Sequence, residues 1–185
     1  KLNHTELSPL HDKAVRSAIA HIINYDSMAK IIGNGATPGG APFPPSANLG
    51  FDSIANKPMT DVAKADQILT QAGYAKNANG IYAKDGKELA LTLAIWGKDT
   101  SLYEEIQQEL KQAGIAVTLK KLQGPGEVDT LGTDGFDMVE RNVVTMSTND
   151  PYWYLSLFYK TGAKANVGAY SNPQVDALID QLSVT

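Results

Sequence analysis

The first seventy residues alternate between helical patterns and a segment that breaks them. Apolar residues recur at the spacing i, i+3, i+4, i+7, at Val15, Ala18, Ile19 and Ile22. This spacing predicts an amphipathic helix from about Asp12 to Ile23, and a short second helix that Asp26 caps and that reaches Ile32. Glycine and proline then concentrate in residues 33–60. Because neither residue suits the interior of a helix or strand, we expect these residues to form mostly a long loop.

The next part of the chain, residues 60–96, is predicted to form a helix followed by a β-hairpin. Residues 60–73 start with Thr-Asp, carry apolar residues on one helical face and end in a glycine, which predicts a third helix. The turn sequence Lys-Asp-Gly-Lys at 84–87 separates an apolar pair at 81–82 from a run at 89–95 that alternates with a period of two. This arrangement predicts a β-hairpin whose second strand ends near Trp96.

A strand–helix–strand unit follows the hairpin. Residues 101–113 place their apolar side chains on one helical face, and residues 115–119 alternate as a strand does. A crossover of more than a dozen residues makes the strands on either side parallel, with a right-handed connection. We expect a further strand at 136–144, a helix that opens at residues 150–151 and a last helix at 172–182. The predicted fold class is α/β.

Composition and charge narrow the classes of function. The chain has 185 residues, 43% hydrophobic and 19% charged, with a net charge of −4 and no cysteine. Such a chain is typical of one globular domain, and its scattered basic residues argue against a nucleic-acid partner. The absence of cysteine excludes disulfides and thiolate sites. No apolar run has the ~20 residues of a membrane span, and no signal peptide is recognisable, so any targeting segment is expected upstream of Lys1.

The sequence contains no recognisable catalytic or metal-binding motif. His11 and His21 would lie about 15 Å apart along a helix at ~1.5 Å per residue, which is too far to share an ion. We expect all three histidines, including His4, to be surface or partly packed residues. The glycines of residues 33–40 precede Ala41-Pro42, whereas a phosphate-binding P-loop requires Lys and Ser or Thr there. No nucleophile elbow occurs. We therefore predict no catalytic residue, no metal site and no cofactor.

One segment combines polar and aromatic residues at a strand-to-helix connection, where α/β proteins bind ligands. It covers residues 145–154, with the sequence Thr-Met-Ser-Thr-Asn-Asp-Pro-Tyr-Trp-Tyr. The alternative interpretation is structural: Asp150 only caps the helix that begins at Pro151, while Trp153, Leu155 and Phe158 fill the core.

Several segments together resemble the peptide/nickel-binding family, family 5, of the solute-binding proteins of ABC importers. The most specific is 61–74, which is similar to the family signature Asp-x-x-Lys-Ala-x-x-Leu-Leu-x-x-Ala-Gly-Tyr. The other matching segments follow in the order of the family: 8–19, the Pro-rich 39–45, 106–119, 136–138, 149–151 and 170–176. Each motif alone is weak, but together, in the correct order, they span nearly the whole chain.

The resemblance implies a two-lobed periplasmic-binding-protein-like fold of type II, each lobe a mixed sheet flanked by helices, with a hinge that closes on ligand. The matching part is the C-terminal lobe, so residues 1–185 are expected to be a single-lobe fragment without the other lobe. The implied role is non-enzymatic: capture of a small peptide or a nickel chelate and delivery to ABC permease subunits. A monomer in the periplasm, or on the cell surface through an upstream lipid anchor, is expected. The rival interpretations are an enzyme or a ligand sensor that keeps the same scaffold, and a structural or interaction module.

The resemblance also implies which residues touch the ligand. They are Arg141, Asn142, Thr145, Ser147, Asn149, Asp150 and Trp153. In peptide-binding members an Asp holds the peptide's amino group, and this position is similar to Ser147, whose hydroxyl carries no charge. In some nickel-binding members a His follows the Asp-Pro pair, whereas Tyr152 follows here. A peptide and a nickel or cobalt chelate therefore both remain open as cargo.

Overall fold

The structure is a computed structural model that describes residues 1–38, 43, 59–145 and 150–183. Within the predicted loop at 33–60, the described residues form neither helix nor strand, and the remainder, 39–42 and 44–58, lies outside the described residues. None of the helices among the described residues has the length and apolar character needed to cross a membrane.

The first long helix forms where the apolar spacing predicted it. A short 3₁₀ helix, η1 (Pro9–His11), leads into α1 (Lys13–Ile22), and the side chain of Asp12 caps α1 by accepting a hydrogen bond from Ala14 N. All four apolar residues of the predicted face are buried: Val15, Ala18, Ile19 and Ile22. The prediction of this helix is confirmed, because the buried face and the cap both come from local sequence.

The second helix starts earlier than predicted. α2 (Tyr25–Ile32) is capped by Asn24, whose side chain accepts a hydrogen bond from Ser27 N at 3.0 Å. The prediction that Asp26 caps this helix was wrong. Asp26 lies in the first turn instead, where a negative charge favours the helix dipole.

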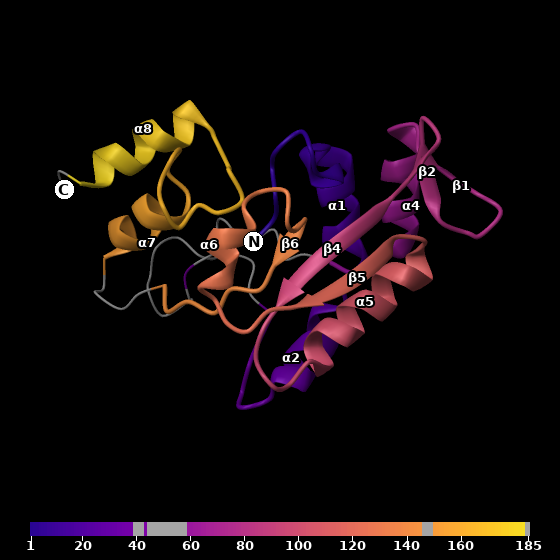
Figure 1. Cartoon of the computed structure of the whole chain (residues 1–185), viewed down its shortest axis with the longest axis horizontal. Helices are drawn as coiled ribbons and strands as arrows, with labels where there is room; N and C mark the ends of the chain where they lie inside the picture. Colours follow the sequence, from indigo (N-terminus) through magenta and orange to yellow (C-terminus); the bar gives the residue numbers. More distant parts are fainter. Residues whose placement is uncertain (39–42, 44–58, 146–149, 184–185) are drawn as a thin grey trace.

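The third helix packs directly against the first. α4 (Val62–Gln71) begins after Asp61, which accepts from Lys64 N at 2.8 Å, and Gly73, with φ +90°, ends the turn that follows. Ala65 and Leu69 bury one face of α4 against the core that α1 shares. Figure 1 shows α4 beside α1, at the end of the molecule opposite to α7 and α8.

The predicted turn forms, but its strands pair differently. β1 (Ala75–Lys76), β2 (Tyr82–Lys84) and β3 (Lys87–Glu88) make a small antiparallel sheet in the order β1-β2-β3. Asp85 and Gly86 both have positive φ, as a tight hairpin turn requires. The prediction that residues 89–95 continue this hairpin holds only for Leu89, whose N–H donates to Tyr82 O at 2.6 Å, because residues 90–95 form a strand of a second sheet.

The second sheet is the parallel layer that the strand–helix–strand pattern predicted. β4 (Ala90–Ile95) pairs with β5 (Ala116–Lys121) in parallel, with Leu93 opposite Leu119, and α5 (Ser101–Ala113) forms the crossover. The sheet has the order β5-β4-β6. An antiparallel bridge between Leu2 and Met138 adds the N-terminal segment, so the layer is mixed.

The last strand is much shorter than residues 136–144. β6 (Met138–Val139) pairs with β4 on one side and bridges to Leu2 on the other, and the hydrogen bond from Glu140 N to Ala94 O, 2.9 Å, is its last backbone contact with β4. β4 ends at Ile95, and Gly97 with φ +92° turns the chain away. The longer strand was wrongly predicted because residues beyond Glu140 have no neighbouring strand to pair with.

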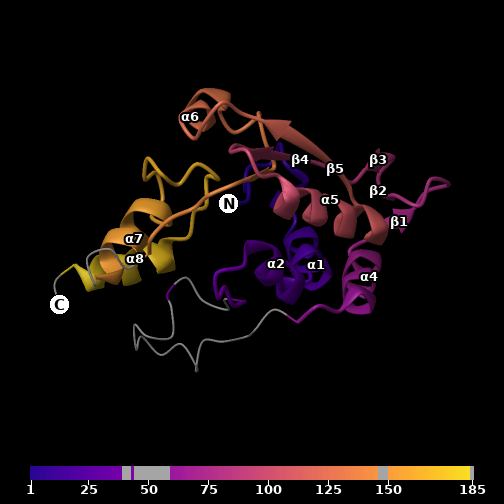
Figure 2. The same cartoon turned by 90° about the horizontal axis from the view of Figure 1, so that it is seen from below.

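Two hydrophobic clusters lie on opposite faces of β4. Leu91, Leu93 and Ile95 join the larger cluster with residues of α1, α4 and α5, whereas Ala94 joins a smaller one. The smaller cluster also contains Val128 of α6 (Glu127–Leu131), a helix that the sequence pattern did not predict. Figure 2 shows α5 and α1 on one side of the strands. The alternation of side chains along β4 therefore separates two cores.

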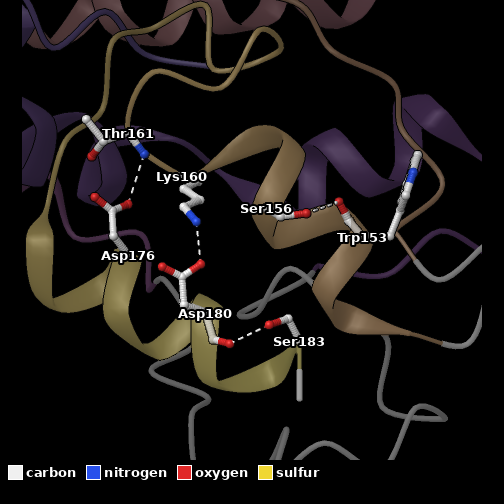
Figure 3. A network of polar contacts seen from close by, with 7 residues as sticks. All are labelled: Trp153, Ser156, Lys160, Thr161, Asp176, Asp180 and Ser183. Carbon is white, nitrogen blue, oxygen red and sulfur yellow. Dashed lines mark hydrogen bonds and ion pairs between the residues drawn. The ribbon is translucent and has the colours of Figure 1, made fainter. Parts of the chain in front are cut away.

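Two helices extend from the sheet at its other end. α7 (Pro151–Phe158) is capped by Asp150 and α8 (Pro173–Leu182) by Asn172, each with proline at the first helical position as predicted. Polar contacts join the two helices, and Figure 3 shows Lys160 paired with Asp180 and Thr161 N with Asp176. The helical prediction for both segments is confirmed.

Candidate ligand-binding site

A cavity of about 410 Å³ lies where the chain leaves β4 and β6 and approaches α7. Its lining combines aromatic, aliphatic, amide and guanidinium groups: Trp96, Pro125, Arg141, Asn142, Val143, Val144, Trp153 and Phe158. β4 and β6 are parallel and end side by side, so the residues after them meet at one edge of the sheet. Parallel sheets commonly bind ligands at this edge.

Aromatic rings form one wall of the cavity. Trp153 is 38% exposed, whereas Phe158 is buried, and their ring centroids lie 6.3 Å apart at an interplanar angle of 73°. The ring of Tyr154 packs against that of Phe158, with the two centroids 5.1 Å apart. Burial and a hydrogen bond with Tyr159 raise the pKa of Tyr154, so this phenol stays neutral at physiological pH. The wall therefore offers a fixed apolar surface with one partly exposed indole.

Arg141 supplies the positive charge of the cavity. Its Nε is buried and has no hydrogen-bond partner among the described residues, and the described residues place no carboxylate within ion-pair distance of it. A buried donor without a partner costs free energy, roughly 1–3 kcal/mol, and more when the group is charged. The guanidinium is therefore suited to an anionic group on a ligand, which it can bind through two parallel hydrogen bonds.

A second cation lies near Arg141. The ammonium of Lys1 donates to Phe158 O at 3.1 Å and lies 4.0 Å from the centroid of the Tyr159 ring. Burial and the charge of Arg141 lower the pKa of the Lys1 side chain to about 8. The Arg141 charge thus lies in a locally positive environment, which further favours an anionic ligand.

The structure brings together three of the predicted ligand-binding residues. Arg141, Asn142 and Trp153 all line the cavity, whereas Thr145 and Asp150 do not. Asp150 accepts a hydrogen bond from Tyr152 N at 2.8 Å and so caps α7, as the structural interpretation held. The other two predicted residues, Ser147 and Asn149, lie outside the described residues. A ligand-binding role for all seven stays a prediction.

Sequence reasoning missed the opposite wall of the cavity. Trp96 follows β4 directly, and Pro125 lies in the turn before α6. Trp96 could have been found from the rule that ligands lie beyond the carboxyl ends of parallel strands, since its strand was recognised. Pro125 carries no comparable signal, because its position depends on a helix that the hydrophobic pattern did not reveal.

Metal-binding groups are not assembled in the part of the chain that the structure describes. No group of three or more His, Asp or Glu side chains there could hold an ion. The cavity instead combines aromatic rings with a guanidinium and an amide. Such a lining can bind an organic molecule that presents an apolar part and an anionic group.

Comparison with known proteins places this chain among bacterial solute-binding proteins. The family model described as bacterial extracellular solute-binding proteins, family 5 Middle, matches residues 1–166. The nickel-binding protein NikA of Staphylococcus aureus is 26% identical over 99% of the chain. The oligopeptide-binding protein OppA of Mycobacterium bovis is 25% identical over 97% of it. The crystal structure of NikZ from Campylobacter jejuni in complex with Ni(L-His) superposes with a TM-score of 0.82, at 21% identity over 97% of the chain.

The match covers only part of each relative. The chain spans 35% of the S. aureus protein, 31% of the M. bovis protein and 37% of the C. jejuni structure. The relatives are thus about three times longer than this chain. The likeness to the C. jejuni structure, at 21% identity, shows the shared α/β fold.

Proposed function

Because this chain belongs to the bacterial extracellular solute-binding proteins of family 5, we propose that it forms one lobe of the solute-binding component of an ABC importer. In this proposal it acts outside the cytoplasm as part of a monomeric, two-lobed protein. Its task is to capture a small peptide or a nickel chelate. It then delivers the cargo to permease subunits in the membrane.

One observation carries the proposal: the cavity at the edge of the parallel sheet combines aromatic walls with the guanidinium of Arg141, whose Nε has no partner among the described residues. Val144 is 70% exposed and Trp153 38% exposed beside the buried ring of Phe158. A half-open apolar surface of this kind suits a second lobe that closes on the ligand. Closure removes water from the cavity and strengthens the electrostatic contact with Arg141.

The positive charge of the cavity favours a cargo that carries a carboxylate. Both candidate classes carry carboxylates, since a peptide ends in one and amino-acid chelators of nickel contain them. Arg141 is the group of this lobe that binds such a carboxylate, and Trp153 packs against the apolar part of the ligand. The two relatives named above are a nickel-binding and an oligopeptide-binding protein, so the names support both classes alike.

Ligand screening of the two-lobed protein tests this proposal. Thermal shift and calorimetry are measured with a mixture of short peptides, with nickel alone and with the nickel–histidine complex. We expect one of these to raise the melting temperature, and Trp153→Ala to abolish most of the shift. The control is Lys87→Met, an exposed residue of β3, the strand that Figure 2 shows at the end of the molecule opposite to α7 and α8. No stabilisation by any of the three would exclude both cargo classes.

A further inference from the structure

Glu140 connects three elements at the edge of the cavity. Its backbone N–H donates to Ala94 O at 2.9 Å, and its carboxylate Oε2 accepts from Trp96 N at 2.8 Å. Burial raises the pKa of the Tyr103 phenol on α5, and so does the hydrogen bond that its hydroxyl donates to the Glu140 carboxylate. Glu140, through its backbone and its side chain, thus connects the segment that follows β6 to the end of β4 and to the first turn of α5.

Two of the groups that Glu140 fixes belong to the cavity. Trp96 lines it directly, and Arg141 is the next residue along the chain. Here both described contacts of the carboxylate go to Trp96 and Tyr103, and Arg141 Nε stays buried without a partner among the described residues.

We propose that Glu140 is a positioning residue of the ligand site. It fixes the backbone of Trp96 and keeps its own charge away from Arg141, so that the indole forms a wall and the guanidinium stays available to an anionic ligand. The part of the inference that concerns ligand rests on the proposed function. The part that concerns Trp96 does not, because it follows from contacts within the protein alone.

Two substitutions separate positioning from a simple charge effect. Glu140→Gln removes the charge but keeps one oxygen that can accept from Trp96 N, whereas Glu140→Ala removes both the charge and the acceptor. If Glu140 acted only through its charge, the two variants would behave alike. Positioning predicts that Gln preserves the site and that Ala disturbs it, since a cavity wall displaced by a fraction of an ångström binds its ligand less well.

The test uses the two-lobed protein labelled with 5-fluorotryptophan and observed by ¹⁹F NMR. Trp96→Phe assigns the Trp96 resonance, and the Trp153 resonance, assigned in the same way, reports whether the rest of the lobe is intact. We expect Glu140→Ala to shift or broaden the Trp96 resonance while Trp153 changes little, and Glu140→Gln to stay close to the parent protein. Tyr103→Phe, which removes one of the two contacts, should produce a smaller change than Glu140→Ala.

Ligand affinity gives the second readout. With nickel–histidine or a tripeptide as the probe, we expect Glu140→Ala to weaken binding about tenfold and Glu140→Gln to leave it within about threefold of the parent value. An unchanged Trp96 resonance in Glu140→Ala, or equal effects of Gln and Ala, would overturn the inference. If Glu140→Ala does not fold, a large change of the Trp96 resonance in Glu140→Gln overturns it instead, and an unchanged one supports it. Failure of every probe to bind the parent protein would count against the proposed function, while the ¹⁹F spectra still decide the role of Glu140.

Discussion

The backbone N–H of Thr161 donates a hydrogen bond to Asp176 Oδ1 at 2.9 Å, and this contact joins the end of α7 to the first turn of α8. Figure 3 shows it beside the pair that Lys160 forms with Asp180 one turn later. Both carboxylates lie on α8 and both partners come just after α7. The position of α8 against α7, the helix that lines the cavity, therefore depends on the carboxylates of Asp176 and Asp180.

This relationship predicts an acid-sensitive contact. Hydrogen bonds from the hydroxyl and the backbone N–H of Thr161, helped by the Lys160 charge, hold the pKa of Asp176 below its usual 3.8. A carboxyl with a lowered pKa in the folded state contributes stability that is complete above the unfolded pKa and is lost as the pH falls through the folded pKa. We expect the amide resonance of Thr161 to titrate below pH 3.8. In Asp176→Asn this titration should disappear, whereas Asp129→Asn should leave it unchanged; its persistence in Asp176→Asn would contradict the assignment.

Gly168 is predicted to tolerate no side chain. A Cβ at this position would lie 2.0 Å from Leu2 O, because the loop before α8 passes directly over the N-terminal segment, where His4 N donates to Gly168 O. Backbone atoms cannot yield as a flexible side chain does, so Gly168→Ala should lower the free energy of unfolding by about 2–3 kcal/mol. Gly124→Ala is the matched control, since nothing lies within 4 Å of its Cβ. Urea unfolding measures both variants, and equal stability would show that the loop does not pack as described.

Leu110 is predicted to be a dominant core residue of α5. Its side chain is fully buried in the larger cluster, between the sheet and α1. Leu110→Ala should therefore cost about 2–5 kcal/mol in the free energy of unfolding through lost contacts and the cavity left behind. Leu178→Ala, at a position of α8 that is 61% exposed, should cost much less. Thermal denaturation of the two variants side by side provides the measurement, and similar losses would argue against the burial pattern.

Arg141 is predicted to select ligands by charge. Arg141→Met keeps much of the aliphatic length but removes the guanidinium, so affinity for a carboxylate-bearing probe should fall at least about tenfold. Amidation of the same probe should weaken binding to the parent protein and have little further effect in Arg141→Met. Calorimetry with a tripeptide and its C-terminal amide, or with nickel–histidine and nickel–histidinamide, measures this coupling. Additive losses would mean that Arg141 does not contact the carboxylate.

How far the sequence predicted the fold differed from one element to another. α1 and α7 followed their local signals, the apolar spacing and the caps Asp12 and Asp150, because a helix forms its hydrogen bonds within one short segment. The predicted pairing of residues 90–95 was wrong, since a strand completes its hydrogen bonds with whichever strand packs beside it. The same reason shortened β6, whose pattern continues to Val144 but whose partner β4 ends at Ile95.

The sequence by itself determined the α/β class, the longer helices and the family resemblance, because these depend on local periodicity and on ordered motifs. It also indicated Arg141, Asn142 and Trp153 as neighbours in one functional segment. Only the tertiary structure decided that Trp96, which lies 45 positions before Arg141, closes the same cavity. Only the tertiary structure showed that the Glu140 carboxylate accepts a hydrogen bond from Trp96 N and not from the adjacent guanidinium of Arg141. The physical reason is that side-chain hydrogen bonds form between groups that packing brings together, and spacing along the chain does not reveal which of several acceptors and donors will meet.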